Sequence, residues 1–473
     1  MNDPMITLSE LVQECGGIYR GPERVLPLSL TINSRSVKKG DVFVAIKGEH
    51  ADGHSYIEDA VSAGAVGIIG ERAKLPEEKL AILDPDSTIT FILAPQDTIT
   101  FLTRLAQGYL EKVCPREVIA VTGSVGKTTT REMIKKVLSC RFQTASPISS
   151  YNTLLGCSLT ILGMPCNTEM LILEMGTNSP GEISQMVAAF RPTLGVITEV
   201  TEAHLQGLVS FDGVLRAKME LMESTMMKCL IYNWDNIQLR NEVNKYSRKM
   251  KLAGVGFQGG YAHIDYPEFR IHQGKPLLNF RLHFPDYTLN VQSRLFGSHQ
   301  ALCLSMALNI AHYLDLPLQS IPLEALGLES LPGRGSLILL PEDNILLIDD
   351  SYNANPQSMN AALNVIEKIS WKGRKIAVLG TMKELGGKTP LFHKEILERT
   401  FWLDVLLLVG EEWREALQML KEGTTAGDLI WVSTYKEAID ILKGKICPGD
   451  LILVKGSHSN ELEKVVSCMV NGK

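Results

Sequence analysis

Residues Val118–Thr130 read VIAVTGSVGKTTT, and this stretch decides how the rest of the chain is interpreted. The apolar run Val118–Val121 predicts a strand that is buried on both faces. Gly123 and Gly126 interrupt the run, and Arg131–Leu138 then has helical spacing. A strand, a glycine-rich turn and a helix start direct backbone N–H groups and the positive end of the helix dipole toward a phosphate.

The residues after the second glycine have the chemistry of a phosphate-binding loop. Lys127 would reach the terminal phosphates of a nucleotide, and the hydroxyl of Thr128 would face Mg²⁺. The strict P-loop pattern has a glycine five residues before Gly126, where this chain has Val121, so the loop is a shortened one. An ordinary strand–helix turn is the alternative, and Gly-Lys-Thr in this context favours phosphate.

The bulk composition is that of globular material. The chain has 473 residues, 45% of them hydrophobic and 21% charged, with a net charge of −6. This length suits about three domains. There is no basic excess, so no nucleic-acid partner is predicted. The N-terminus has no secretory signal and no apolar stretch is long enough to span a bilayer, so we expect no membrane insertion.

The nine cysteines are scattered along the chain and form no CxxC pair. Neither a zinc site nor a disulfide framework is therefore predicted. Reduced thiols suit a cytoplasmic protein, and that is the location we expect.

Residues 1–95 are expected to form a small α/β unit. The expected elements are a helix over Leu8–Cys15 and strands over Asp41–Ile46, Ala65–Ile69 and Thr88–Ala94. Between them lie the polar clusters Asn33-Ser34-Arg35 and Asp52-Gly53-His54. Such clusters at strand ends often hold a ligand, and the same residue types also favour turns. The local sequence leaves both interpretations open.

Residues 96–317 are expected to form the central unit, which contains the phosphate loop. Further elements are expected at Asp97–Lys112, Met170–Leu173, Thr193–Ile197, Gly213–Ser224 and Gly297–Leu314. Buried strands precede Glu174 and His204, and ligands of parallel sheets bind at the carboxyl ends of strands. We therefore expect Thr128, Glu174 and His204 on one rim, with Glu174 able to supply oxygen to Mg²⁺. A capping role for Glu174 or His204 is the alternative. Lys218 is expected by default to lie on a solvated helix face.

The sequence pattern changes twice in the rest of the chain. Pro276–Phe284 and Tyr287–Leu295 alternate polar and apolar residues, which predicts an antiparallel hairpin inside the otherwise parallel central unit. Residues 318–473 then alternate strands and helices, which predicts a doubly wound sheet. Its expected strands are Ile345–Asp349, Lys375–Leu379, Val405–Val409, Leu429–Val432 and Leu451–Val454. This last unit has no phosphate loop of its own, so it could complete a site that begins in the central unit.

Several short motifs, taken in chain order, resemble those of the Mur ligases. They are Gly123-Ser124-x-Gly126-Lys127-Thr128-Thr129, Glu174-x-Gly176, Ala203-His204-Leu205-x-Gly207, Ala217-Lys218-x-Glu220, Pro332-Gly333-Arg334 and Asp349-Asp350-Ser351-Tyr352-Asn353-Ala354-Asn355-Pro356. The resemblance covers nearly the whole chain and implies a three-domain α/β architecture. The implied domains are a small N-terminal α/β domain that binds a UDP-sugar substrate (1–95), a central P-loop ATPase domain with a parallel sheet (96–317) and a C-terminal Rossmann-like ligase domain (318–473).

The resemblance implies ATP-driven amide bond formation in the cytoplasm by a monomer. The Asp349–Pro356 stretch, together with Val378–Gly386 and Val454–Ser457, is similar to the family member that adds D-alanyl-D-alanine to UDP-N-acetylmuramoyl-tripeptide. A carboxylate would attack the γ-phosphate of ATP, and the dipeptide amine would then attack the resulting acyl phosphate. The implied pathway is peptidoglycan synthesis.

The resemblance also implies a role for each matching residue. The ATP site would contain Gly123, Ser124, Gly126, Lys127, Thr128, Thr129, Arg334 and Asp350. The substrates would be bound by Ser34, Arg35, Asp52, Gly53, His54, Asn152, Tyr352, Asn353, Asn355 and Lys455. Lys127, Glu174, His204 and Lys218 would take part in catalysis. Two Mg²⁺ ions would be held by Thr128, Glu174, His204 and Lys218, the last as a carbamate formed with CO₂.

Some positions depart from the family pattern. Gln300 and Cys303 stand where two asparagines are usual, which leaves the adenine contact open. Thr381 replaces a common Asp, His458 replaces an Arg, Asn33 replaces an Asp, and the loop Asn152–Ser158 keeps only part of the Asn-Asn-x-x-Gly-x-Pro pattern. We expect an active enzyme with altered peripheral contacts. A sister ligase that adds one amino acid, a folylpolyglutamate synthetase and a nucleotide-binding protein without catalysis remain alternatives.

Overall fold

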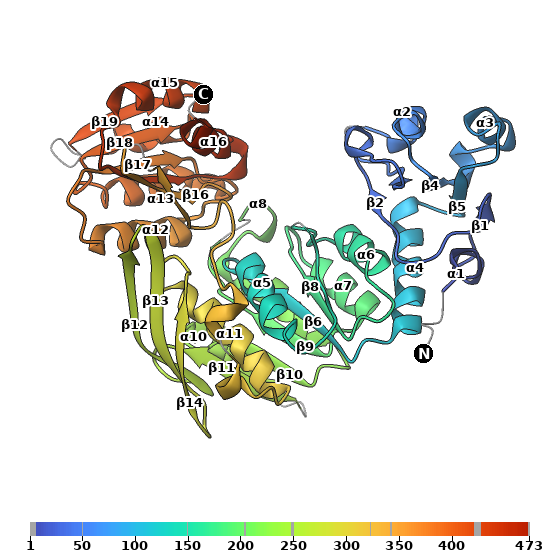
Figure 1. Ribbon diagram of the computed structural model, residues 1–473, viewed down its shortest axis with the longest axis horizontal. Helices are drawn as coiled ribbons and strands as arrows, with labels where there is room; N and C mark the ends of the chain where they lie inside the picture. The colour runs from blue at the N-terminus through green and yellow to red at the C-terminus, as the bar shows by residue number, and fades with distance from the viewer. Residues whose placement is uncertain are drawn as a thin grey trace.

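The computed structural model describes residues 6–49, 51–148, 150–202, 205–246, 250–321, 323–340, 343–420 and 427–471. Within these residues the strands form three sheets, one in each successive part of the chain. Figure 1 shows the N-terminal and C-terminal units on opposite sides, both resting on the central unit. The predicted three-part α/β architecture is confirmed.

The first sheet has the order β1-β5-β4-β3-β2, with β1 antiparallel to β5 and the other pairs parallel. Its strands are β1 (Ile18–Arg20), β2 (Leu30–Thr31), β3 (Val42–Val44), β4 (Gly67–Glu71) and β5 (Thr90–Ala94), and its helices are α1 (Leu8–Glu14), α2 (Ile57–Ser62) and α3 (Glu77–Leu83). Helix α4 (Thr98–Val113) connects this unit to the next, because its Phe101 packs in one core with Val42 of β3 and Ala120 of the central sheet.

The central sheet has nine strands in the order β14-β13-β12-β11-β10-β9-β6-β8-β7. The parallel part comprises β6 (Glu117–Thr122), β7 (Thr144–Ala145), β8 (Met170–Glu174), β9 (Leu194–Ile197), β10 (Cys229–Asn233) and β11 (Lys251–Gly256). The antiparallel part comprises β12 (Ala262–His272), β13 (Lys275–His283) and β14 (Thr288–Ser293), which confirms the predicted hairpin. The helices are α5 (Lys127–Leu138), α6 (Leu154–Leu162), α7 (Glu182–Phe190), α8 (Leu205–Leu208), α9 (Phe211–Met219), α10 (Ile237–Asn244) and α11 (Gln300–Tyr313).

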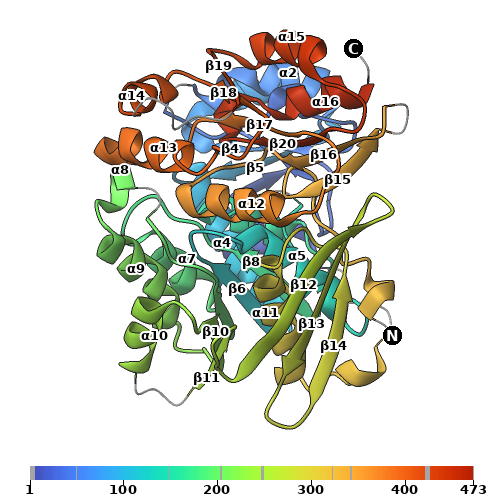
Figure 2. The same ribbon diagram turned by 90° about the vertical axis from the view of Figure 1, so that its left-hand side faces the viewer.

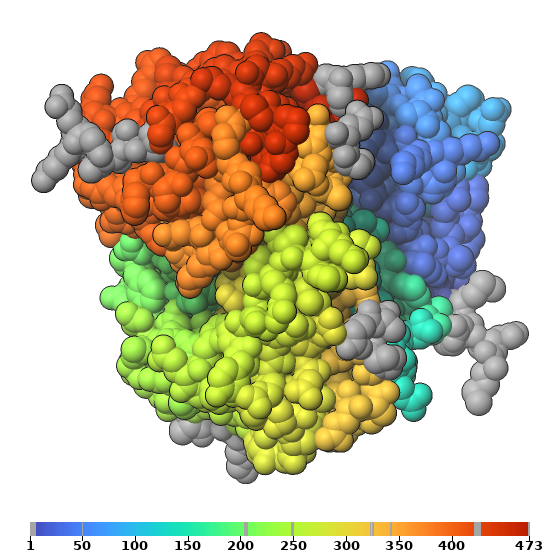
Figure 3. All heavy atoms as spheres, turned by 60° about the vertical axis from the view of Figure 1, so that its left-hand side comes forward, coloured from blue at the N-terminus to red at the C-terminus, as the bar shows by residue number. Residues whose placement is uncertain are grey.

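The hairpin of β12 and β13 forms an arm that reaches the C-terminal unit. Phe269 of β12 packs against the cores of both the central and the C-terminal unit, and its ring meets that of Phe296 edge to face at 5.6 Å. Ile271 packs against the C-terminal core as well. Figures 2 and 3 show the arm, in yellow-green, rising against the orange C-terminal unit. The contact is apolar and lies away from the phosphate loop.

The C-terminal sheet has the order β15-β16-β20-β17-β18-β19, parallel except for the antiparallel edge strand β15. Its strands are β15 (Ser336–Leu340), β16 (Ile345–Asp350), β17 (Lys375–Gly380), β18 (Val405–Val409), β19 (Asp428–Val432) and β20 (Leu451–Lys455). Its helices are α12 (Pro356–Lys368), α13 (Thr389–Leu397), α14 (Trp413–Gln418), α15 (Tyr435–Lys445) and α16 (Glu463–Asn471). Two separate cores cover its faces, one with α12 to α14 and one with α15 and α16, so the sheet is doubly wound as predicted.

The expected domain limits stay predictions. Leu318, Leu323 and Leu328 pack in the central core, so the central packing continues past the expected limit at residue 317. In the described part of the chain, no helix has both the length and the apolar character that crossing a membrane requires. All nine cysteines are free thiols in the structure.

Candidate active site between the central and C-terminal units

The phosphate loop between β6 and α5 depends on its two glycines. Gly123 has φ +143°, and a Cβ added there would lie 2.0 Å from Thr198 Oγ1. Gly126 has φ +88° and caps α5. The neighbouring strand end holds the loop, because Ser124 N donates to Glu199 O at 2.6 Å and Thr198 Oγ1 donates to Val125 O at 2.7 Å. Only glycine adopts this path without strain.

Three side chains predicted for catalysis or metal binding, Lys127, Thr128 and Glu174, meet at this loop. Lys127 Nζ donates to Gly123 O at 2.8 Å, and burial lowers the pKa of this lysine, although the Glu174 charge opposes the shift. Thr128 Oγ1 donates to Glu174 Oε1 at 3.2 Å, so the ends of β6 and β8 share a rim as predicted. Arg131 Nη1 lies 3.4 Å from Glu174 Oε2. His204, the third residue expected on this rim, lies outside the described residues.

Thr128 and Glu174 fit one Mg²⁺ ion. A hydroxyl and a carboxylate oxygen lie side by side at a helix N-terminus, and oxygen is the ligand that Mg²⁺ prefers. Among the described residues, no group of three or more His, Cys, Asp or Glu side chains gathers as a metal site. The pair therefore suits an ion whose remaining ligands are phosphate oxygens or water.

The structure contradicts the default interpretation of Lys218 as a solvated side chain. Lys218 on α9 is 0% exposed, and its Nζ has no hydrogen-bond partner among the described residues. Burial, and secondarily the charge of Lys127, holds the pKa of this lysine well below its usual value. A buried neutral amine is nucleophilic, so this residue fits the carbamate that the resemblance implies.

On the opposite side of the site, Asp350 and Lys455 end the paired strands β16 and β20 and form an ion pair of 2.7 Å. Lys455 is 2% exposed and also donates to Asn353 O at 3.0 Å. Burial raises the pKa of Asp350, and the charge of Lys455 opposes this. The pair holds a carboxylate and a cation at the carboxyl end of the sheet.

Tyr352 connects the two units. Its hydroxyl lies 2.6 Å from Ser150 Oγ of the central unit. The guanidinium of Arg334 lies 4.1 Å from the centre of its ring, and the ring of His458 stacks on it at 5.8 Å. His458, where the family usually has arginine, thus continues a stack of planar groups.

The predicted amides lie in the same region. Asn355 Oδ1 accepts from Ser358 N at 2.8 Å and caps α12, and Asn353 Oδ1 accepts from Ala354 N at 2.8 Å. Each of these oxygens is engaged within its own turn, so a ligand would meet the amide N–H groups. Asn152 O accepts from Gly176 N at 2.7 Å, and its side chain occupies the space that a Cβ on Gly176 would need.

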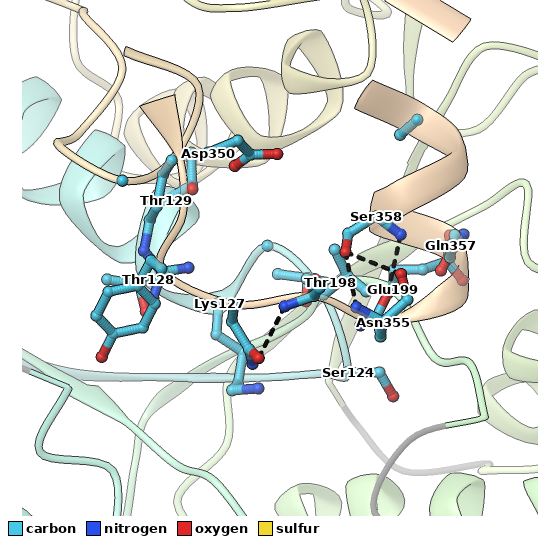
Figure 4. Close-up of a pocket in the computed structure, with 18 of the residues that line it drawn as sticks. Ser124, Lys127, Thr128, Thr129, Thr198, Glu199, Asp350, Asn355, Gln357 and Ser358 are labelled. Atoms are coloured by element: carbon cyan, nitrogen blue, oxygen red, sulfur yellow. Dashed lines mark hydrogen bonds between the residues drawn. The ribbon is translucent and has the colours of Figure 1, made fainter. Parts of the chain in front are cut away.

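These side chains line one cavity of about 720 Å³ between the two units, part of which Figure 4 shows. The predicted residues that line it are Ser124, Gly126, Lys127, Thr128, Thr129, Asn152, Glu174, Arg334, Asp350, Tyr352, Asn353, Asn355 and Lys455. Ser150, Thr198, Glu199 and Gln357 also line it and were not predicted as site residues. The position of Glu199 just beyond the end of β9 was the signal that could have identified it.

The predicted residues of the first unit do not line this cavity. His54 Nδ1 lies 2.7 Å from Asp52 Oδ1, and His54 Nε2 accepts from Glu71 N at 2.9 Å. Lys74 Nζ lies 2.8 Å from Asp52 Oδ2, and this hydrogen bond is the main reason that the pKa of Asp52 is lowered. Gly53 leaves no room for a Cβ, which would lie 2.7 Å from Ile46 N.

These local contacts explain why Asp, Gly and His occur in this turn, and a substrate role for them stays a prediction. Ser34 and Arg35 form a short 3-10 helix that the Asn33 side chain caps. Their substrate role stays a prediction as well.

Comparisons with known proteins match most of the chain. The family models described as "Mur ligase family, catalytic domain", "Mur ligase middle domain" and "Mur ligase, glutamate ligase domain" match residues 29–89, 121–311 and 333–458. The UDP-N-acetylmuramoyl-tripeptide–D-alanyl-D-alanine ligase of Bacillus subtilis (strain 168) is 31% identical over 98% of each chain.

Two solved structures are similar along nearly their whole length. MurF from Acinetobacter baumannii has a TM-score of 0.80 and 25% identity, covering 99% of this chain and 100% of that one. The MurF ligase from Thermotoga maritima in complex with ADP has a TM-score of 0.77 and 27% identity, covering 94% and 97%.

Proposed function

The chain belongs to the Mur ligase family, and we propose that it uses ATP to join D-alanyl-D-alanine to UDP-N-acetylmuramoyl-tripeptide. The product would be the UDP-MurNAc-pentapeptide of peptidoglycan synthesis. One observation carries the proposal: the phosphate loop with Lys127 and the segment Asp350–Asn355 line the same cavity from two units. The similarity to a relative with bound ADP supports ATP as the nucleotide.

The first half of the reaction brings two anions together. The tripeptide carboxylate would attack the γ-phosphorus of ATP, forming a C–O–P bond and releasing ADP. The N–H groups of the loop from Gly123 to Thr129, the dipole of α5 and the Lys127 ammonium would stabilise the charge that develops on the phosphate oxygens. The loop is already held in place by Thr198, so little reorganisation is needed during the reaction.

The second half needs the C-terminal unit. The free amine of the dipeptide would attack the acyl carbon, and the tetrahedral intermediate would collapse with loss of inorganic phosphate. The amide N–H groups of Asn353 and Asn355 would bind the acceptor, because its carboxylate and peptide oxygens accept hydrogen bonds. Closure of this unit would also exclude water from the acyl phosphate.

Two Mg²⁺ ions are part of the proposal. Thr128 and Glu174 would hold one ion, and His204 with the carbamate of Lys218 would hold the second. Such ions supply Lewis-acid stabilisation of transferring phosphate oxygens. Carbamate formation joins Lys218 Nζ to the carbon of CO₂ with loss of a proton, and the low pKa of this amine keeps the nucleophilic form available. A monomer in the cytoplasm stays our prediction for the working protein.

The experiment that tests the proposal is a reaction with defined substrates. The full chain is incubated with ATP, Mg²⁺, UDP-MurNAc-tripeptide and D-alanyl-D-alanine, and the product is weighed by mass spectrometry while phosphate release is followed. Tripeptides ending in lysine and in meso-diaminopimelate are compared.

A product heavier than the tripeptide by one dipeptide less one water supports the proposal. Phosphate release only with single amino acids would instead indicate a sister ligase, and release only with a folate and glutamate a folylpolyglutamate synthetase. No release with any acceptor would indicate a binding protein.

A further inference from the structure

The cavity has apolar side chains in its lining as well as polar ones. They include Leu302 and Met306 of α11 and Ala361 of α12, and the thiol of Cys303 lines the cavity too. Cys303 lies against the phosphate loop, because a Cβ on Gly126 would lie 3.1 Å from Cys303 Sγ. Apolar lining beside a phosphate loop suits the planar base of a nucleotide.

Glu199 lines the same cavity, and neighbouring donors fix its carboxylate. Oε1 accepts from Asn236 Nδ2 at 2.5 Å and from Val200 N at 3.0 Å, and Oε2 accepts from Asn233 Nδ2 at 2.7 Å. The Gln357 side chain of α12 bonds to the same carboxylate. Figure 4 shows Glu199 and Gln357 close together at the start of α12. These partners are uncharged amides, so none of them neutralises the carboxylate on the cavity wall.

The carboxylate and the amide together match one edge of adenine. Adenine carries an amino group at C6 beside a ring nitrogen that accepts hydrogen bonds. The amino group would donate to Glu199, and the ring nitrogen would accept from the Gln357 amide. A base with oxygen at C6 would place that oxygen against the Glu199 carboxylate, and two acceptors repel each other.

The positions where the family usually has asparagine do not provide this recognition. Cys303 has a weakly hydrogen-bonding thiol whose pKa burial raises. Gln300 Nε2 donates to Arg334 O at 3.3 Å, across to the C-terminal unit. The adenine contact that these two departures leave open can therefore come from the wall formed by Glu199 and Gln357.

We propose that Glu199 and Gln357 read the 6-amino edge of adenine and that Glu199 selects ATP over purine nucleotides with an oxygen at C6. This inference rests on the proposed function, because it takes the cavity to be the nucleotide site. Burial raises the pKa of Glu199, which indicates a poorly hydrated surrounding in which a hydrogen bond to the base discriminates strongly. Glu199 is thus a specificity residue in addition to its contacts with Asn233 and Asn236.

The test compares three nucleotides on the full chain and on Glu199→Gln. ATP carries an amino group at C6, inosine triphosphate an oxygen, and purine riboside triphosphate neither. Binding constants are measured by calorimetry without the peptide substrates. The unchanged chain is expected to prefer ATP to inosine triphosphate by about ten- to hundredfold, as for a hydrogen bond to a charged group.

Glu199→Gln should lower the preference for ATP over inosine triphosphate about tenfold, because its amide can donate to oxygen at C6. Its affinity for purine riboside triphosphate should stay unchanged. Glu202→Gln is the matched control: Glu202 pairs with Lys388 at 2.7 Å and does not line the cavity, so this variant should keep the original ratio. Gln357→Leu should weaken the binding of ATP and of purine riboside triphosphate alike, because both bases carry the accepting ring nitrogen.

If Glu199 had only a structural role, Glu199→Gln would weaken the binding of all three nucleotides equally. An unchanged ratio of ATP affinity to inosine triphosphate affinity in this variant would overturn the inference. Failure of the proposed function would give a different set of results. If ATP binds with the predicted selectivity but no ligase product forms, the inference survives and the proposed function fails. If no nucleotide binds, both are wrong.

Discussion

The amine of Lys218 lies fully buried on α9, without a hydrogen-bond partner in the described part of the chain. An unsatisfied buried polar group of this kind destabilises a fold, and proteins retain such groups mainly where function needs them. Local sequence indicated a solvated lysine here, because a helix of mixed polarity does not reveal which side faces the sheet. Only the packed structure separates the two interpretations.

Lys218→Met is expected to abolish turnover and to stabilise the protein. The methionine keeps the volume of the side chain and removes the unsatisfied amine. In CO₂-free buffer, the unfolded chain protonates Lys218 below its ordinary pKa of 10.5, whereas the folded chain resists protonation until its lowered pKa is reached. Stability of the unchanged protein should therefore rise with pH between these two values.

The methionine variant should lack that rise and unfold at a higher temperature near neutral pH. Thermal melts across a pH series, with and without added bicarbonate, measure both effects. Bicarbonate should alter the melts of the unchanged protein alone. A variant that is less stable than the unchanged protein at neutral pH would contradict this account.

Lys127→Ala and Glu174→Ala are expected to remove activity without unfolding the chain. Lys127 would stabilise charge on the transferred phosphate, and losing one such donor lowers turnover by roughly a hundred- to a thousandfold. Glu174→Ala should in addition raise the Mg²⁺ concentration that half-saturates the reaction. Phosphate release measures turnover, and circular dichroism checks the fold. Near-normal activity in either variant would show that the site is assigned wrongly.

At the scale of single elements, the loop from Gly123 to Gly126 illustrates what the sequence could predict. Two glycines, Lys127 and Thr128 lie within six residues, so their local order alone indicates a phosphate loop. Glu199 follows the end of β9 and Gln357 lies in α12, and only folding brings them together. Contacts to the phosphate could thus be predicted from one stretch, whereas contacts to the base could not.

The restriction to local sequence also explains which strands were predicted. β16, β17 and β18 are buried on both faces and read as continuous apolar runs. β12 escapes prediction because its residues are mixed and half-exposed, whereas β15 is a half-buried edge strand whose apolar run was missed. β10 is fully buried, and its short apolar run was missed all the same.

Gly123→Ala is expected to abolish nucleotide binding while the rest of the central unit stays folded. The new Cβ would meet Thr198 Oγ1 at 2.0 Å in a backbone conformation that alanine avoids. Gly40→Ala is the matched control, because Gly40 also has a positive φ, of +100°, but no atom lies within 4 Å of an added Cβ. Calorimetry with ATP compares the variants. Equal ATP affinity in both would mean that the path of this loop is unimportant.

For the whole molecule, the contacts between the central and C-terminal units fall into two kinds. Phe269 and Phe296 of the central unit make an apolar contact with the C-terminal core. The other contacts are polar and include Ser150 with Tyr352 at 2.6 Å and Gln300 with Arg334 at 3.3 Å in the cavity lining, and Glu202 with Lys388 at 2.7 Å outside it. Exposed polar pairs contribute little to stability, whereas an aromatic pair in which Phe296 is buried and Phe269 half-buried contributes more. The arm is therefore suited to act as a pivot about which the cavity opens and closes.

Ligand binding is expected to draw the two units together, because the cavity takes its walls from both. Without ligands, the weak polar contacts at the cavity should open part of the time, and the radius of gyration should be larger. ATP with UDP-MurNAc-tripeptide should compact the molecule, as measured by solution scattering. In Lys127→Ala, the compaction on adding ATP should be smaller. Weakening the pivot with Phe269→Ala should broaden the distribution of shapes in the ligand-free protein while leaving the cavity residues intact. Scattering curves that do not change when both substrates are added would argue that the units are rigidly joined and that the site is complete without closure.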